Sequence, residues 1–183
     1  MLFVILLLVL LVAVVAWMIA VYNGLVGLRV RADSAWSDID VQLKRRHDLI
    51  PNLVETVKGY AGHEKSTFEN IAKYRSAAMS ATTTVDRVAA EGQLTQALKT
   101  LFAVAENYPE LRASEQFMSL QGSLKEVEDN IQNSRRYYNA VIHDFNTRLQ
   151  TFPSNVVAGM FGFQTRPFFE MEAGEREPVA VKF

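Results

Sequence analysis

The chain begins with an unbroken run of apolar residues. Residues 2–21, LFVILLLVLLVAVVAWMIAV, contain no charged, amide or hydroxyl side chain. At a rise of about 1.5 Å per residue, these twenty residues form a helix of about 30 Å, which matches the hydrocarbon core of a bilayer. No Lys or Arg precedes the run and no clean small-x-small cleavage site follows it, so a cleaved secretory signal is disfavoured. The run predicts a retained membrane-spanning anchor.

The predicted anchor covers residues 1–22 and ends in the headgroup region, where Trp and Tyr are enriched in membrane proteins. Trp17 and Tyr22 lie close to this exit. The side chains expected to contact lipid include Leu2, Leu8, Val15, Trp17, Val21 and Tyr22.

The nearest basic residues all follow the anchor; they are Arg29, Arg31, Lys44, Arg45 and Arg46. Positive charge close to a membrane span normally stays in the cytoplasm. We therefore expect a single-pass protein of the cell inner membrane, with its N-terminus outside and its soluble domain in the cytoplasm.

Charge and cysteine content exclude several classes of protein. The 19 basic and 20 acidic residues give a net charge of -1, so no large one-signed field is present to attract nucleic acid. The chain has no cysteine, which excludes disulfides, thiolate catalysis and thiolate zinc sites.

Apolar residues recur every three or four positions through most of the remaining chain, which is typical of amphipathic helices. The first pattern follows the anchor directly and runs to about Tyr60, in a helix of nearly 90 Å at the standard rise. Pro51 lacks a backbone N–H, so we expect a kink or a break near residues 47–51.

Three further helices are expected, over residues 68–79, 88–105 and 117–148, the last with the most regular pattern. The sequence thus predicts an all-α fold, in which an N-terminal transmembrane helix continues into an elongated antiparallel up-and-down bundle of about four helices. The bundle is expected to occupy residues 23–153. A short apolar segment and a flexible acidic tail are expected over residues 154–183.

Reaction chemistry is not apparent in the sequence. His63-Glu64 begins like a zinc-protease motif, but Thr67 stands where the second histidine would be needed. We interpret His47, His63 and His143 as surface or capping residues. No nucleophile elbow or phosphate-binding glycine loop is present. We expect no catalytic residues, no metal, no cofactor and no small-molecule substrate.

Charged residues lie next to the apolar positions of several predicted helices. A polar layer between helices is one interpretation, with a role in fixing helix register or in docking a partner, and ordinary solvated ion pairs are the alternative. The candidate residues for this layer are Arg45, Arg46, Asp48, Glu64, Glu128 and Arg135.

The segment after Pro153 carries more apolar side chains than a free tail should. It is therefore predicted to contact the membrane interface or a neighbouring subunit. The residues expected to make this contact are Met160, Phe161, Phe163, Phe168 and Phe169.

Several of these stretches resemble the LemA family. The resemblance is carried by residues 22–64, with the blocks QLKRRHDLIPNLV and GYAGHE, by residues 107–124 and 133–146, and by the pieces FP and MFGF near the end. It implies a single-pass bacterial membrane protein with a helical cytoplasmic domain and no established enzymatic activity. It also implies roles like those of relatives that act in forming magnetosome membranes, in membrane-protein quality control or in signalling.

The sequence favours a non-enzymatic, membrane-anchored helical scaffold that self-associates and organises or shapes the membrane at its cytoplasmic face. Its expected partners are membrane lipid and further copies of the chain, and no nucleic acid. An adaptor that docks a membrane protease or a sensor kinase is the alternative function.

Overall fold

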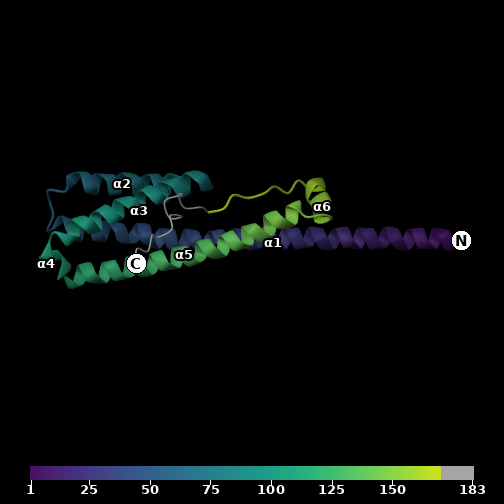
Figure 1. Ribbon diagram of the computed structural model, residues 1–183, viewed down its shortest axis with the longest axis horizontal. Helices are drawn as coiled ribbons and strands as arrows, with labels where there is room; N and C mark the ends of the chain where they lie inside the picture. Colours follow the sequence, from purple (N-terminus) through teal and green to yellow (C-terminus); the bar gives the residue numbers. More distant parts are fainter. Residues whose placement is uncertain (170–183) are drawn as a thin grey trace, which may run out of the picture. The chain divides into compact units, whose positions relative to one another are not determined.

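The computed structural model describes residues 1–169, which form six helices and no strand. This confirms the predicted all-α fold and its long apolar N-terminal helix. The helices are α1 (Leu2–Lys58), α2 (Lys65–Ser80), α3 (Thr84–Glu106), α4 (Pro109–Arg112), α5 (Glu115–Gln150) and α6 (Ser154–Met160) (Figure 1). The two short helices α4 and α6 add to the four that were predicted. The acidic tail expected after Glu170 lies outside the described residues.

Local chemistry explains where these helices begin and end. The hydroxyl of Thr83 accepts a hydrogen bond from the backbone N–H of Asp86 at 3.1 Å, so the threonine-rich loop provides the N-cap of α3. Pro109 occupies the first turn of α4, where its missing N–H removes no helical hydrogen bond. α1 ends at Lys58, directly before Gly59.

The break expected near residues 47–51 is absent, because α1 continues through Pro51 to Lys58. Pro51 cannot donate to the carbonyl oxygen of His47, which is the acceptor four residues earlier. The side chain of Arg75 on α2 takes this place, and its Nε donates to that oxygen at 2.8 Å. A side chain from another helix therefore satisfies the backbone group that proline leaves without a partner.

The chain divides into two compact units. Among the described residues, unit 1 comprises residues 1–38 and 134–168, and unit 2 comprises residues 39–133 and Phe169. The core of unit 1 joins α1, the end of α5 and α6; its buried residues are Val21, Leu25, Phe145, Leu149, Val157 and Ala158.

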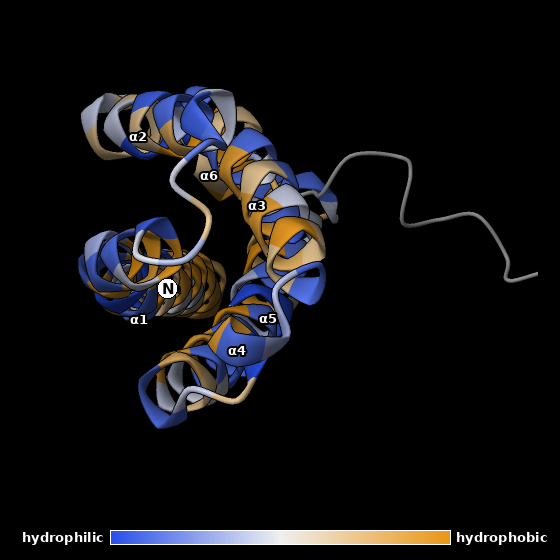
Figure 2. Ribbon diagram, turned by 90° about the vertical axis from the view of Figure 1, so that its left-hand side faces the viewer, coloured by the Kyte–Doolittle hydropathy of each residue, from blue (hydrophilic) through white to orange (hydrophobic). Residues whose placement is uncertain are grey.

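Unit 2 holds the larger hydrophobic core, which draws residues from five helices between Ile50 and Leu124. Within it, α2 and α3 lie side by side (Figure 1). Figure 2 shows apolar and polar stretches together on α3, as expected for a helix that packs on one side only.

α1 is the one helix within residues 1–169 that is long and apolar enough to cross a membrane. Its apolar side chains are exposed from Leu2 to Val15, and Trp17 and Ile19 are also exposed. Burial begins at Val21, which is 7% exposed. The predicted lipid-facing residues therefore divide: Leu2, Leu8, Val15 and Trp17 are exposed, whereas Val21 is buried and Tyr22 is half-buried in unit 1.

Candidate functional site

Unit 2 contains a buried cluster of charged side chains. Arg46 on α1 and Glu91 on α3 are both 0% exposed, and their Nη1 and Oε2 atoms lie 3.3 Å apart. Arg46 Nη2 also donates to Thr95 Oγ1 at 2.6 Å. Glu91 Oε1 lies 2.8 Å from His47 Nε2, and because a carboxylate only accepts, this nitrogen carries the hydrogen.

A second carboxylate completes the cluster. Glu128 on α5 places Oε1 3.0 Å from Arg46 Nε, although this Nε lacks a well-aligned hydrogen bond. The Glu128 side chain is 37% exposed, so it links the buried pair to solvent. Burying a charge is unfavourable unless it is paired and hydrogen-bonded, and the cluster satisfies both conditions for Arg46 and Glu91.

The sequence pattern predicted Arg46 and Glu128 for a polar layer, but it also contains a signal for Glu91, which was not predicted. Arg46 lies three residues after Leu43 and four before Ile50, within the apolar spacing of α1. Glu91 lies three residues before Leu94, within the corresponding spacing of α3. A charged residue on the inner side of a helix needs a buried partner, but the sequence does not reveal which residue that is.

The position of His47 corrects the sequence interpretation. His47 is 7% exposed and bonded to Glu91, so it is neither a surface nor a capping residue. The interpretation failed because His47 was judged without the α3 partner that buries it. His63 and His143 are exposed.

The structure brings together only part of the predicted polar layer. Arg46 and Glu128 meet in the cluster, whereas Arg45 and Asp48 are exposed on the same helix. Glu64 is half-buried, and its carbonyl oxygen accepts from the first turn of α2. Arg135 is half-buried and belongs to unit 1.

A groove of about 780 Å³ adjoins the charged cluster. Its apolar lining includes Phe102 on α3 and Met118 on α5, and Met118 is 51% exposed. Lys99 and Lys125 provide two cationic groups along the groove, and Arg46 and Glu128 also line it. The groove combines an apolar surface with basic side chains, as a site for an amphipathic, acidic segment would require.

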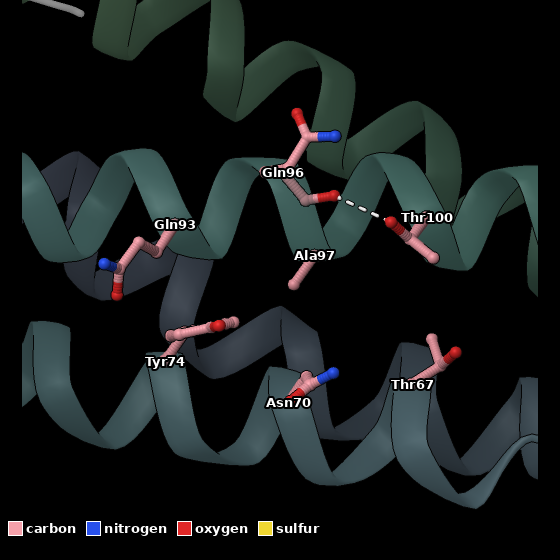
Figure 3. A pocket seen from close by; sticks show the side chains of 7 residues that line it. All are labelled: Thr67, Asn70, Tyr74, Gln93, Gln96, Ala97 and Thr100. Carbon is pink, nitrogen blue, oxygen red and sulfur yellow. Dashed lines mark hydrogen bonds between the residues drawn. The ribbon is translucent and has the colours of Figure 1, made fainter.

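A smaller pocket of about 260 Å³ lies between α2 and α3. Figure 3 shows Asn70 and Tyr74 of α2 across from residues of α3 that include Gln93 and Thr100. Thr100 Oγ1 donates to the carbonyl oxygen of Gln96 at 3.2 Å, so this hydroxyl is engaged within its own helix. The lining contains no charged side chain, and the pocket offers no acid, base or activated nucleophile.

The segment after α6 packs on other residues of unit 1. The ring of Tyr22 lies 4.7 Å from that of Phe161 and 5.8 Å from that of Phe163. Phe163 also packs at 6.4 Å from Phe145. Of the apolar residues predicted to make an external contact, Met160, Phe161 and Phe168 are exposed, Phe163 is half-buried and Phe169 is buried.

The chain beyond Phe163 is attached to α5 by polar contacts. The hydroxyl of Tyr138 donates to the carbonyl oxygen of Pro167 at 3.1 Å. Burial raises the pKa of Tyr138; the nearby Arg166 opposes this effect and Asp33 adds to it. Arg166 and Asp33 also form an ion pair with each other.

Known proteins resemble this chain over most of its length. Magnetosome protein MamQ 2 of Paramagnetospirillum magneticum is 25% identical over 194 residues, which cover 92% of this chain and 71% of that protein. Magnetosome protein MamQ of Magnetospirillum gryphiswaldense is 24% identical over 192 residues, covering 90% and 71%. Protein LemA of Metamycoplasma hominis is 28% identical over 149 residues, covering 80% and 67%.

The exposed apolar helix and these relatives together indicate a membrane-associated helical protein. The family model named LemA family matches residues 35–183, which include both the charged cluster and the segment after α6. The chain therefore belongs to the LemA family.

Proposed function

We propose that this chain is a non-enzymatic scaffold anchored in the inner membrane by the first twenty residues of α1. The observation that carries the proposal is the abrupt change in burial along α1. Apart from the half-buried Met18, apolar side chains up to Ile19 are exposed, and the buried core of unit 1 begins at Val21. In water, such a continuous apolar surface would be strongly unfavourable, and a bilayer core about 30 Å thick removes that cost.

The proposed orientation is a single pass with the N-terminus outside and the helical units in the cytoplasm. Arg29 and Arg31 follow the apolar run within ten residues, where basic residues have the greatest influence on orientation.

The proposed scaffold self-associates and organises or shapes the membrane at its cytoplasmic face. The likeness to magnetosome proteins supports a membrane-associated role. The buried charges support a structural role, because Arg46 and Glu91 engage each other and their hydrogen-bonding partners inside unit 2. Lipid and further copies of the chain are the proposed partners.

Single-cysteine labelling tests the anchor and its orientation, because the natural chain has no cysteine. In the full chain, Val30→Cys should react with a membrane-impermeant maleimide in inside-out vesicles and not in intact spheroplasts. Labelling only in spheroplasts would overturn the orientation, and recovery of the chain in the soluble fraction would overturn the anchor. A single copy per nanodisc, measured by mass, would overturn self-association.

The groove of unit 2 favours a second candidate function, an adaptor that docks a membrane protease or a sensor kinase. A photo-reactive amino acid at Met118, which lines the groove, tests this role in cells. Met79 is the matched control, because it is a methionine of similar exposure that does not line the groove. One dominant foreign membrane protein crosslinked only from position 118 would support the adaptor, and adducts between copies of the chain would support the scaffold.

A further inference from the structure

Unit 1 carries a second apolar surface that is separate in sequence from the N-terminal run. Four side chains between residues 152 and 161 are exposed: Phe152 at 77%, Val156 at 52%, Met160 at 65% and Phe161 at 53%. The chain has no charged residue from Leu149 to Thr165. A contiguous group of exposed apolar side chains typically marks a surface that contacts protein or membrane.

The opposite side of α6 fixes this surface in place. Val157 and Ala158 are buried in the core of unit 1, together with Val21 of α1. The hydroxyl of Ser154 lies 2.6 Å from the carbonyl oxygen of Arg148 and 2.8 Å from that of Thr151, and it is hydrogen-bonded to both. Val156 and Met160 are four residues apart and therefore share the exposed side of the helix.

The surface lies where the apolar run of α1 meets the core of unit 1. The Phe161 ring contacts the Tyr22 ring, with 4.7 Å between centroids. Trp17 and Phe152 line one groove of about 620 Å³, together with the exposed Arg148. Trp is enriched at the level of the lipid headgroups, and a neighbouring arginine suits their phosphates.

We propose that residues 152–161 form a second membrane contact, which lies in the boundary between headgroups and acyl chains beside the emerging α1. The inference rests on the proposed anchor, because the lipid that covers residues 2–20 also reaches a surface in contact with Tyr22. An interfacial helix of this type buries its apolar side about 5–10 Å into that boundary. Lipid is the proposed occupant because Phe152 of this surface and Trp17 of the exposed part of α1 line the same groove.

Fluorescent labels on single cysteines of the full chain in liposomes test the contact. Val156→Cys is compared with Val30→Cys, a valine of the same unit with 55% exposure against 52%. Val30 lies eight residues beyond Tyr22, or about 12 Å along α1, which is beyond the headgroup layer. Leu8→Cys reports on the anchor, and nitroxide lipids and aqueous iodide serve as the two quenchers.

At position 156 we expect a blue-shifted emission that is quenched by lipids with the nitroxide near the headgroup and is not quenched by iodide. Position 30 should respond only to iodide, and position 8 only to nitroxide lipids. Iodide quenching at 156 without lipid quenching would overturn the inference and leave the anchor intact. Protection of 156 from both quenchers would overturn it in favour of a contact between copies. Iodide quenching at position 8 would overturn the anchor as well.

Discussion

At the scale of single residues, the decisive feature is a pair of charges placed at core positions. Arg46 and Glu91 occupy positions where the apolar spacing of their helices would accept Leu or Ile. Replacing a buried ion pair by apolar residues is often neutral for stability, whereas removing one partner leaves an uncompensated charge. The cluster therefore contributes mainly by making α1 and α3 dependent on one arrangement.

Arg46→Met should lower the free energy of unfolding by about 3–5 kcal/mol, because Glu91 would remain buried without its cation. The measurement is chemical denaturation of the full chain in detergent, followed by circular dichroism. Arg45→Met is the matched control, since Arg45 is exposed, and its effect should stay within about 0.5 kcal/mol. Equal effects of the two substitutions would contradict the role of Arg46 as the buried partner of Glu91. Adding Glu91→Leu to Arg46→Met should recover part of the lost unfolding free energy, because it removes the unpaired carboxylate.

The contact between Arg75 and the carbonyl oxygen of His47 is predicted to depend on Pro51. Arg75→Leu should lower the free energy of unfolding by about 1.5–3 kcal/mol, because that oxygen loses a charged donor. In a Pro51→Ala background the loss should be smaller, since the substituted residue supplies the helical N–H that proline lacks. A double-mutant cycle measures the difference, and additive effects would show that the two residues act independently.

Tyr138 should make stability depend on pH in alkaline solution. Because burial raises its pKa above the ordinary value of about 10, the folded state holds the phenolic proton more tightly than the unfolded state. Its contribution is complete below about pH 10 and is lost as the pH rises through the raised folded-state value. Tyr138→Phe should remove this part of the decline, which begins above about pH 10, measured as unfolding free energy against pH. An unchanged slope in the variant would refute the prediction.

At the scale of elements, the extended chain after α6 depends on side chains of α5. Asn146 makes two hydrogen bonds with the backbone of Arg166, donating to its carbonyl oxygen and accepting from its N–H, each at 2.9 Å. An amide side chain offers a donor and an acceptor side by side. It can therefore pair with the N–H and C=O of one residue, as the backbone of a neighbouring β-strand would. Residues with no secondary structure of their own are thereby held on a helix.

Asn146→Ala should release this segment. Loss of the Asn146 amide leaves the half-buried N–H and C=O of Arg166 without partners, which should lower the stability of the attached segment by about 1–3 kcal/mol. Amide hydrogen exchange at Arg166 should accelerate accordingly. Asn155→Ala is the control, since Asn155 is exposed on α6 and should leave the exchange of Arg166 unchanged. Unchanged exchange in the Asn146 variant would contradict this role.

At the scale of the whole molecule, the anchor should tolerate one charge and fail with several. Each Leu, Ile, Phe or Val contributes about -0.3 to -0.6 kcal/mol to insertion, and each central Lys opposes it by about 2.5–3.5 kcal/mol. Leu8→Lys alone should therefore remain in the membrane fraction after an alkaline wash. The triple variant Leu8→Lys, Leu10→Lys and Val12→Lys should move to the soluble fraction, while the same three changes to Ala should not. Retention of the lysine triple variant would contradict the anchor.

The sequence predicted the helices well because their signals are local. The spacing of Phe117, Leu124 and Ile131 follows the helical period, and all three are buried on α5. The effect of Pro51 could not be foreseen, because the residue that compensates for it lies on another helix. Glu91 and Thr95 were missed for the same reason, and His47 was misjudged.

By itself, the sequence determined the length and apolar character of the N-terminal run, the all-α fold and the family. These follow from periodicity, composition and continuous motifs, which are properties of neighbouring residues. Only the tertiary structure decided that Arg46 meets Glu91 and Glu128, and that Tyr22 packs against Phe161. Such pairings depend on which sides of the helices pack together. Helices with similar apolar patterns can bury their apolar side chains in more than one packing arrangement.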